Sequence, residues 1–352
     1  MPQDVWLMFV LLTMNGGLMV GAPSFSRRDI LFSVTVGEPF RLTSLARATT
    51  LHYRLLVIAG TLVAAAVVVA AESPRARIIG PLVQVAAAAG AWAWAHRRTL
   101  PHAAAVPATR EVSLVARDTR LPGGPLAAIG PFVILGAAAL YLYLNWDLIP
   151  DRFPHHWNAN GVPDRWSVKA VGSVYSTLAM GVAIVALTLA QGVFVLRRTR
   201  QVAASGEAAV SEQSYKRGTA RYTTATTYVM ALLFSYFATR KLSGTDAQLG
   251  WEIWVLLGVI IAMSLSVTVW MIRIGQGGQR RVGAAARVAV PGDATSDSAW
   301  KAGLVYFNPA DPALFVERRS GLGWTLNFGN ALSWVFMALA LLGPFLIMRF
   351  MS

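Results

Sequence analysis

The segment LLVIAGTLVAAAVVVAA, residues Leu55–Ala71, decides the class of this protein, because it runs for 17 residues without a charged side chain. A helix needs about 20 mostly apolar residues to cross the roughly 30 Å hydrocarbon core of a bilayer, with a lower bound near 17. Lipid offers no partners to backbone amides, so such a run must bond to itself as a helix. The segment therefore predicts a transmembrane helix.

Seven further apolar runs share this character. In chain order the eight runs are Asp4–Gly21, Leu55–Ala71, Ile78–Ala95, Leu126–Asn145, Val171–Leu196, Tyr222–Thr239, Trp251–Ile272 and Ala331–Phe350. One run alone also suits a buried helix of a soluble protein, but eight in succession, in a chain that is 55% hydrophobic and 14% charged, favour a membrane protein. We expect an all-α polytopic membrane protein with about eight transmembrane helices.

The basic residues are unevenly shared between the gaps that separate these runs. The gaps after runs one, three, five and seven hold 23 of the 31 Lys and Arg residues. Loops rich in Lys and Arg are retained in the cytoplasm, so the alternation predicts a multi-pass protein with both termini outside. Arg outnumbers Lys by 27 to 4, which suggests a GC-rich bacterial genome and hence the bacterial plasma membrane.

Two of the runs leave alternatives open. The first carries Asp4 and no Lys or Arg before its apolar stretch, which favours a retained helix over a secretory signal. The third, Ile78–Ala95, is Ala-rich and contains Gln84, so its hydrophobic drive for insertion is weak. We expect it to insert as a hairpin with the second run. If that hairpin is only interfacial, the chain crosses the membrane six times.

The net charge of +14 is the sum of the predicted cytoplasmic loops, which would meet anionic lipid headgroups at about 1 kcal/mol per basic residue. It therefore predicts the lipid bilayer as a partner and no nucleic acid. The chain contains no Cys, which excludes disulfides, thiolate metal sites and a Cys nucleophile.

The gap between the fourth and fifth runs reads NWDLIPDRFPHHWNANGVPDRWSVK from Asn145 to Lys169, and it faces outward on the charge pattern. Its three prolines each fix a backbone angle and bias the preceding residue away from helix, and Asn160-Gly161 is a strong turn dipeptide. The segment predicts a constrained loop rather than a flexible linker. Its three tryptophans suit the headgroup depth of the bilayer.

Three interpretations of this outer loop remain open. A divalent metal site would use a histidine and two aspartates, but the spacing matches no zinc signature and adjacent histidines normally point apart. A recognition surface would use aromatic anchors with Asp and Arg as orienting groups. A structural cap would use the same groups in turns and ion pairs. We expect no metal and no cofactor. The candidate ligand- or partner-binding residues are Asp151, His155, His156, Asn158, Gly161, Asp164 and Arg165.

The string IPDRFPHHWNANGVPDRW, residues 149–166, resembles the hallmark segment of the SdpI-like family of bacterial integral membrane proteins, of the type called domain of unknown function 1648. The family pattern places a His shortly after an Ile- or Phe-Pro pair and follows it with Asn, Gly and Pro-Asp. His156, Asn158, Gly161 and Asp164 occupy those positions. The resemblance implies immunity or signalling, with an outer loop that meets an extracellular toxin or ligand.

A second motif precedes the last run and is cytoplasmic by the same count. Residues 305–329 read VYFNPADPALFVERRSGLGWTLNFG, in which Asn-Pro and Asp-Pro initiate turns between strand-like segments. The stretch resembles another family, the domain of unknown function 5808, in its Tyr-x-Asn-Pro-x-Asp-Pro start and its Gly-x-Gly-Trp-Thr-x-Asn end. The resemblance to SdpI-like proteins implies that cytoplasmic loops engage a regulator, and this motif is the candidate inner site. The residues of this cytoplasmic motif are Asn308, Asp311, Gly321, Gly323, Trp324 and Asn327.

Other interpretations of this motif also stay open. Gly321-x-Gly323 lacks the third glycine and the lysine of a nucleotide-binding loop. Arg318 and Arg319 are candidates for contact with lipid phosphates. The plainest interpretation is a short hairpin that seats the last helix. The loop Ser26–Arg41 is also strand-like, and we expect it to pack with the Tyr306 segment as a small cytoplasmic β element.

The apolar runs contain little catalytic or transport chemistry, since all 17 acidic residues fall in loops or at run ends. Coupled transporters usually keep ionisable groups inside their spans. Neutral groups such as Asn15, Gln84 and Gln191 suit interhelical hydrogen bonds. The absence of a His-Glu-x-x-His string and of a nucleophile elbow argues against an enzyme.

We expect four segments along the chain: residues 1–121 with runs one to three, 122–200 with the outer loop between runs four and five, 201–300 with runs six and seven and mobile cytoplasmic loops, and 301–352 with the cytoplasmic motif and last helix. The predicted function is that of a non-enzymatic integral membrane protein of SdpI-type immunity or signalling, whose partners are an extracellular peptide or small ligand and a cytoplasmic regulator. The alternative is a small-molecule transporter or permease gated by the outer loop, with a polar cavity between Asn15, Gln84 and Gln191.

Overall fold

A computed structural model describes residues 3–71, 73, 77–104, 119–158, 161–198, 206–244, 248–281, 295–320 and 323–351. The chain divides into two compact units, each assembled from segments that are distant in sequence. The first unit combines Met1–Ala116, Thr199–Tyr215 and Met271–Asn330, and the second combines Arg117–Arg198, Lys216–Trp270 and Ala331–Ser352. The predicted division into four consecutive segments stays a prediction.

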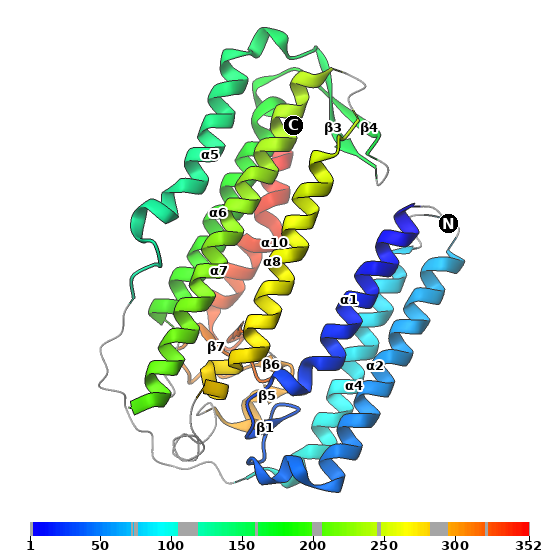
Figure 1. Cartoon of the computed structure of the whole chain (residues 1–352), viewed down its shortest axis with the longest axis vertical. Coiled ribbons are helices and arrows are strands. Elements are labelled where there is room, and N and C mark those ends of the chain that lie inside the picture. Colours follow the sequence, from blue (N-terminus) through cyan, green and yellow to red (C-terminus); the bar gives the residue numbers. More distant parts are fainter. Residues whose placement is uncertain are drawn as a thin grey trace. The chain divides into compact units, whose positions relative to one another are not determined.

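A helix forms at each predicted apolar run. The bounds are α1 (Gln3–Phe25), α2 (Ser44–Ala70), α4 (Ile79–Thr99), α5 (Gly124–Leu144), α6 (Val171–Arg198), α7 (Gly206–Thr239), α8 (Glu252–Ile274) and α10 (Ala331–Met351) (Figure 1). Within the described residues, five stretches are long and apolar enough to cross a membrane: Met8–Phe25, Ser44–Ala70, Gly124–Leu144, Val171–Arg197 and Glu252–Gly278. Membrane-type helices are thus confirmed, whereas the count of eight spans is not.

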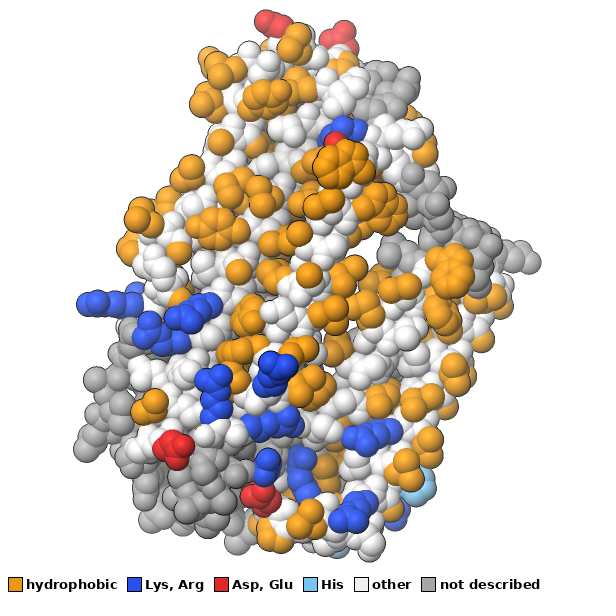
Figure 2. All heavy atoms as spheres, in the orientation of Figure 1, with side chains coloured by type: hydrophobic (Ala, Val, Ile, Leu, Met, Phe, Trp, Pro, Cys, Tyr) orange, Lys and Arg blue, Asp and Glu red, His pale blue; other side chains and the backbone are white. Residues whose placement is uncertain are grey.

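The three remaining helices do not meet this length and apolarity within the described residues. Helix α4 is Ala-rich and ends in His96, Arg97 and Arg98. Helix α7 begins with polar and charged turns before it becomes apolar. In α10 the described apolar stretch is Ala331–Gly343, which is shorter than a span. In Figure 2 hydrophobic side chains cover the visible surfaces of the helices, as expected for helices that face lipid.

Helices α2 and α4 pack closely as the predicted hairpin of the first unit. A side chain at Gly80 would bring its Cβ to 2.4 Å from Val68 Cγ2 and 2.8 Å from the carbonyl oxygen of Ala64, so only glycine permits this approach. Gln84 is buried in the same bundle. Its side chain accepts from Asn15 Nδ2 at 3.0 Å and donates to the carbonyl oxygen of Leu12 at 2.7 Å, which joins α4 to α1. These groups act as interhelical hydrogen-bond partners.

Three antiparallel hairpins complete the first unit. They are β1 (Ile30–Leu31) with β2 (Val34–Thr35), β5 (Trp300–Lys301) with β6 (Val305–Tyr306), and β7 (Phe315–Glu317) with β8 (Trp324–Leu326). We call them, with their turns, the hairpin module. Ser33 Oγ donates to the carbonyl oxygen of Gly303 at 2.6 Å, so the turn after β1 is bonded to the turn after β5. The predicted packing of the first loop with the Tyr306 segment is confirmed.

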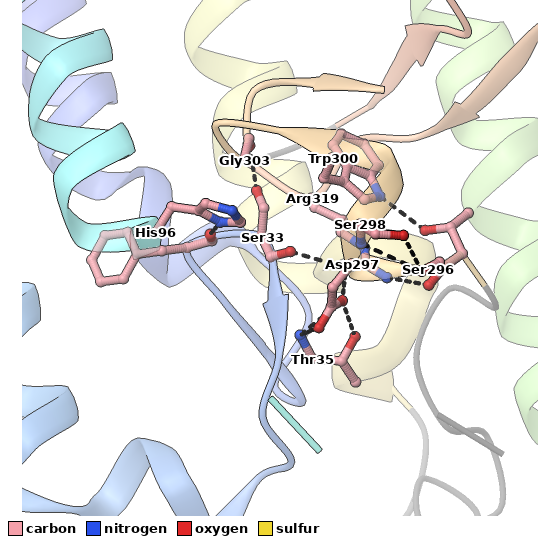
Figure 3. Close-up of polar contacts among 11 residues, drawn as sticks. Ser33, Thr35, His96, Ser296, Asp297, Ser298, Trp300, Gly303 and Arg319 are labelled. Atoms are coloured by element: carbon pink, nitrogen blue, oxygen red, sulfur yellow. Dashed lines mark hydrogen bonds and ion pairs between the residues drawn. The ribbon is translucent and has the colours of Figure 1, made fainter. Parts of the chain in front are cut away.

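The guanidinium of Arg319 lies buried at the centre of the hairpin module (Figure 3). It pairs with the carboxylate of Asp297, donates to the carbonyl oxygens of Ser33 at 2.9 Å and Thr295 at 2.7 Å, and lies 5.6 Å from the ring centroid of Trp300. Because this cation is fully engaged inside protein, the interpretation that Arg319 meets lipid phosphates is wrong. Arg318 is exposed.

Parts of the loops that were predicted to be mobile form regular contacts instead. Residues 206–214 belong to α7. Gln276 is buried, and its side chain accepts from Tyr215 Oη at 2.9 Å. The prediction failed there because a Gly- and Gln-rich composition does not show which polar group has a buried partner. Residues 199–205 and 282–294 lie outside the described part of the chain.

The second unit is a bundle built on α6, which packs against α5 and α10. Its core contains Leu135 and Leu142 of α5, Val174 and Val185 of α6, and Phe153 from the loop that joins the two helices. The end of α5 and the start of α6 therefore carry an apolar platform on which that loop folds.

We predict that Arg319→Ala destabilises the hairpin module by about 3–5 kcal/mol, because it leaves the largely buried Asp297 carboxylate without its cation. The measurement is the unfolding midpoint of the purified protein together with limited proteolysis of the module. The control is Arg28→Ala. Arg28 pairs with Glu38 at 3.2 Å on the surface, and its loss should cost about 0–1 kcal/mol. Equal losses in the two variants would contradict the central role of Arg319.

Candidate functional site

The predicted outer loop folds as a two-stranded antiparallel hairpin, β3 (Arg152–Trp157) with β4 (Pro163–Val168). It follows α5 and the short helix η3 (Trp146–Leu148), and α6 begins three residues after it (Figure 1). The two strands accommodate their prolines because of where these residues lie. Pro163 is the first residue of β4, and Pro154 lies where the strand register shifts. At such positions the strand ladder does not need the backbone N–H that proline lacks.

The base of the hairpin is held by apolar and aromatic contacts. Phe153 is fully buried in the core of the second unit. Trp157 packs on Phe237 of α7, with ring centroids 5.7 Å apart, and Trp146 stacks on Tyr175 of α6 at 6.4 Å. These contacts fix the base of the hairpin to three helices. The polar side chains that the hairpin carries are therefore held in place.

Asn158 and Gly161 form the turn of the hairpin. The amide of Gly161 donates to the carbonyl oxygen of Asn158 at 2.9 Å, and the Asn158 side chain accepts from the amide of Val162 at 3.1 Å. Gly161 has a φ of +75°, and its carbonyl oxygen accepts from the amide of Leu249 at 2.8 Å. Glycine is required here because other residues rarely adopt this φ. Both residues therefore shape the hairpin.

The two adjacent histidines have separate partners. His156 Nδ1 lies 2.5 Å from Asp164 Oδ1, and the two side chains are 51% and 39% exposed. His155 Nδ1 lies 3.0 Å from Ser167 Oγ. The register shifts on either side of His156 allow neighbouring residues of one strand to reach different positions on the other. The result is a solvent-facing His–Asp pair.

Lys241, which the sequence analysis missed, lies buried beneath this hairpin. Its Nζ donates to the carbonyl oxygens of Ser173, at 3.1 Å, and Val174, and lies 5.3 Å from the ring centroid of Phe153. Burial lowers the pKa of Lys241 to about 7. A lysine just after an apolar run normally reads as an interfacial residue, so no sequence signal distinguishes this one.

The electrostatics of the hairpin favour a neutral His155. Burial lowers the pKa of His155, and the positive charges of His156, Arg165 and Lys241 lower it further. Asp164 acts in the opposite direction but is the smallest contribution. At neutral pH the charged surface of the hairpin is therefore set by its Asp and Arg side chains rather than by His155.

The remaining predicted residues are Asp151, just before β3, and Arg165, which lies opposite His156 in β4. Asp151 and Arg165 are exposed, and the carbonyl oxygen of Asp151 accepts from the amide of Lys169 at 2.8 Å. Among the described residues, no group of three or more His, Cys, Asp or Glu side chains is placed to hold a metal ion. The hairpin thus brings His156, Asp164 and Arg165 to one exposed end, with Asn158 and Gly161 as its turn.

The polar residues of the second motif, residues 305–329, are mainly internal partners of one another. Buried Asn327 donates from Nδ2 to the carbonyl oxygens of Asn308 and Asp311, both at 2.9 Å, and its Oδ1 accepts from the amide of Asn308 at 3.0 Å. Asp311 accepts from Tyr306 Oη at 2.9 Å. These three residues join the segment before β7 to the end of β8, as the hairpin interpretation expects.

The glycine and tryptophan of the motif contact a different segment. Gln276 bonds both backbone groups of Gly323, at 2.9 Å each, and Trp324 packs on Tyr215 with ring centroids 5.4 Å apart. Burial and the charge of Glu317 raise the pKa of Tyr215, so its hydroxyl stays protonated as the donor to Gln276. Gly321 lies outside the described residues.

Comparison with known families locates both motifs. Residues 133–180, from α5 through the β3–β4 hairpin into α6, match a domain of unknown function (DUF1648). Residues 309–334 match a family of unknown function (DUF5808). No curated protein and no solved structure matches the chain. The two matches confirm the two recognised motifs, while membership of the SdpI-like family is not shown.

We predict that Lys241 makes the stability of the second unit depend on pH. The pKa of the Lys241 amine in the folded protein lies below its ordinary value near 10.4. As the pH falls, this amine is therefore protonated in the unfolded chain before it is protonated in the folded protein. Stability should be greatest above about pH 10 and fall by up to about 1.4 kcal/mol per unit towards pH 7. Lys241→Met should flatten this slope in unfolding-midpoint measurements. Lys169→Met, at the edge of the same loop, should retain it, and parallel slopes for wild type and Lys241→Met would refute the assignment.

Proposed function

We propose that the chain is a non-enzymatic membrane protein of SdpI-type immunity or signalling, in which the β3–β4 hairpin faces outward and recognises a secreted peptide or other extracellular ligand. One observation carries the proposal: the exposed pair of His156 and Asp164 stands on a hairpin whose base is buried among three helices. The buried base of the hairpin lowers the entropy cost of binding, because the polar groups are ordered before the ligand binds.

The chemistry of the hairpin suits a polar or basic peptide. The Asp164 carboxylate can accept from a ligand amine or guanidinium, while Arg165 can donate to a ligand carboxylate. Trp166, 39% exposed, offers an aromatic surface beside them. Among the described residues no group of three or more His, Cys, Asp or Glu side chains is placed to hold a metal ion, and the exposed polar side chains of the hairpin suit binding of a ligand.

A cytoplasmic regulator would contact the hairpin module of the first unit. Its motif residues Asn308, Asp311 and Asn327 are engaged in internal bonds, so we assign them to the shape of the module rather than to direct contact. The transporter alternative has less support, since Asn15 and Gln84 satisfy each other in the first unit. Gln191 belongs to the second unit.

The proposal predicts toxin sensitivity. A strain that lacks the protein should be more sensitive than wild type to at least one toxin in a panel of secreted peptides. Complementation by His156→Ala or Asp164→Asn should restore about tenfold less protection than wild type, the effect of losing one charged hydrogen bond. Asp147→Asn, an exposed carboxylate just before the hairpin, should protect fully. Membrane levels of each variant are compared by immunoblot, and unchanged sensitivity of the deletion strain to every toxin would count against immunity.

Orientation is tested separately by cysteine labelling, which is direct because the chain has no native Cys. Val162→Cys, 39% exposed beside the turn, should react with an impermeant maleimide on intact cells. Lys301→Cys, exposed in the hairpin module, should react only after lysis. The reverse pattern would place the hairpin in the cytoplasm and end the extracellular proposal.

A further inference from the structure

A cavity of about 250 Å³ lies in the first unit, where α1 ends and α2 begins. Three guanidinium groups line it, those of Arg41, Arg47 and Arg54. Its remaining walls come from the end of α1, the β1 strand and the first turns of α2. The cavity is smaller than a pocket for a drug-sized molecule, and its size suits a compact anionic group.

The positive charge of this cavity is not neutralised by the described residues. No described carboxylate lies within ion-pair distance of the three arginines. The nearby carboxylates of Asp29 and Glu38 attract Arg41 through space but pair directly with Arg27 at 3.5 Å and Arg28 at 3.2 Å. The cavity therefore retains an excess of positive charge.

The arginines bond only to neutral groups or to none. Arg41 donates to the carbonyl oxygens of Pro23 at 3.2 Å, Arg27 at 2.8 Å and Ile30. Arg54 donates to Ser24 Oγ at 3.0 Å. The buried Nε atoms of Arg41 and Arg54 have no hydrogen-bond partner. The side chain of Arg47 is exposed and has no hydrogen bond or ion pair to the described part of the chain.

The cavity lies at the depth of lipid headgroups if α2 spans the membrane. A helix of 27 residues is about 40 Å long, about 10 Å more than the hydrocarbon thickness. Arg54 immediately precedes the apolar segment Leu55–Ala71. The arginine end of α2 thus lies where phosphate groups are found and where long basic side chains reach for them.

An apolar stripe continues from the cavity along the same face of α2. Leu51, Ile58 and Leu62 are 56%, 45% and 66% exposed. At 100° per residue these positions fall within about 60° of one another and next to Arg47 and Arg54. The cationic cavity is complementary to an anionic headgroup, and the apolar stripe is complementary to the acyl chain of the same lipid.

We propose that this cavity binds the phosphate of an anionic phospholipid, with an acyl chain along the stripe of Leu51, Ile58 and Leu62. Planar guanidinium groups bond phosphate oxygens in pairs. The stripe distinguishes a lipid from a free phosphate, which would gain nothing from it. The bound lipid would join α1, α2 and the loop that leads into the hairpin module.

The test uses the full-length protein, delipidated in detergent, and three probes measured by native mass spectrometry. Dioleoyl-phosphatidylglycerol carries both phosphate and chains, dioleoylglycerol has the same chains without phosphate, and inorganic phosphate has no chains. We expect the phospholipid to bind at least about tenfold more tightly than either of the others. Equal binding of dioleoylglycerol would overturn the phosphate contact, and equal binding of inorganic phosphate would overturn the lipid assignment.

Variants locate the site. Arg47→Gln should weaken phospholipid binding about fivefold, and the addition of Arg54→Gln should weaken it by a similar factor again. Arg47 holds no internal bond, so its replacement leaves the fold intact. Arg97→Gln removes an exposed arginine in the last turn of α4 and should bind lipid normally. Unchanged binding in Arg47→Gln, or equal loss in Arg97→Gln, would overturn the site.

Discussion

An unpaired polar group inside hydrocarbon costs several kcal/mol. In a chain of apolar, membrane-type helices, polar side chains are therefore largely restricted to the helix ends and the connections between helices. The few polar side chains within the helices obey this constraint, as Gln84 shows by bonding to α1 on both of its amide atoms. The remaining polar chemistry lies in two β structures, the β3–β4 hairpin of the second unit and the hairpin module of the first. Both depend on helices for their support.

The two β structures use polar side chains in different ways. In the hairpin module the charged and amide groups turn inward, with Arg319 at the centre and Asn327 joining two segments. Such groups specify one arrangement of short strands that bury too little apolar area to hold together alone. In the β3–β4 hairpin the inward groups are aromatic, and the polar pair faces solvent. Exposed, ordered polar groups on a buried base are typical of recognition rather than of packing.

Arginine accordingly has several roles in one chain. The charge of Arg319 is neutralised by Asp297 within the protein, whereas Arg41, Arg47 and Arg54 surround a cavity that lacks a described carboxylate. The difference lies in the groups that surround each guanidinium, because a carboxylate lies against Arg319 and none lies within ion-pair distance of the other three among the described residues. Lys241 adds a third situation, a buried amine whose charge is disfavoured by desolvation.

Hydrophobic run length determined the positions of the helices from sequence alone, since backbone bonding in a helix is local. Turn chemistry likewise predicted a constrained segment around Asn160-Gly161, although the two strands that flank the turn were not predicted. Only the tertiary structure decided that His156 pairs with Asp164 across a register shift, that Lys241 lies beneath them, and that Arg319 is buried rather than lipid-facing. These contacts join residues 8 to 286 positions apart, and no local propensity encodes which distant groups become partners.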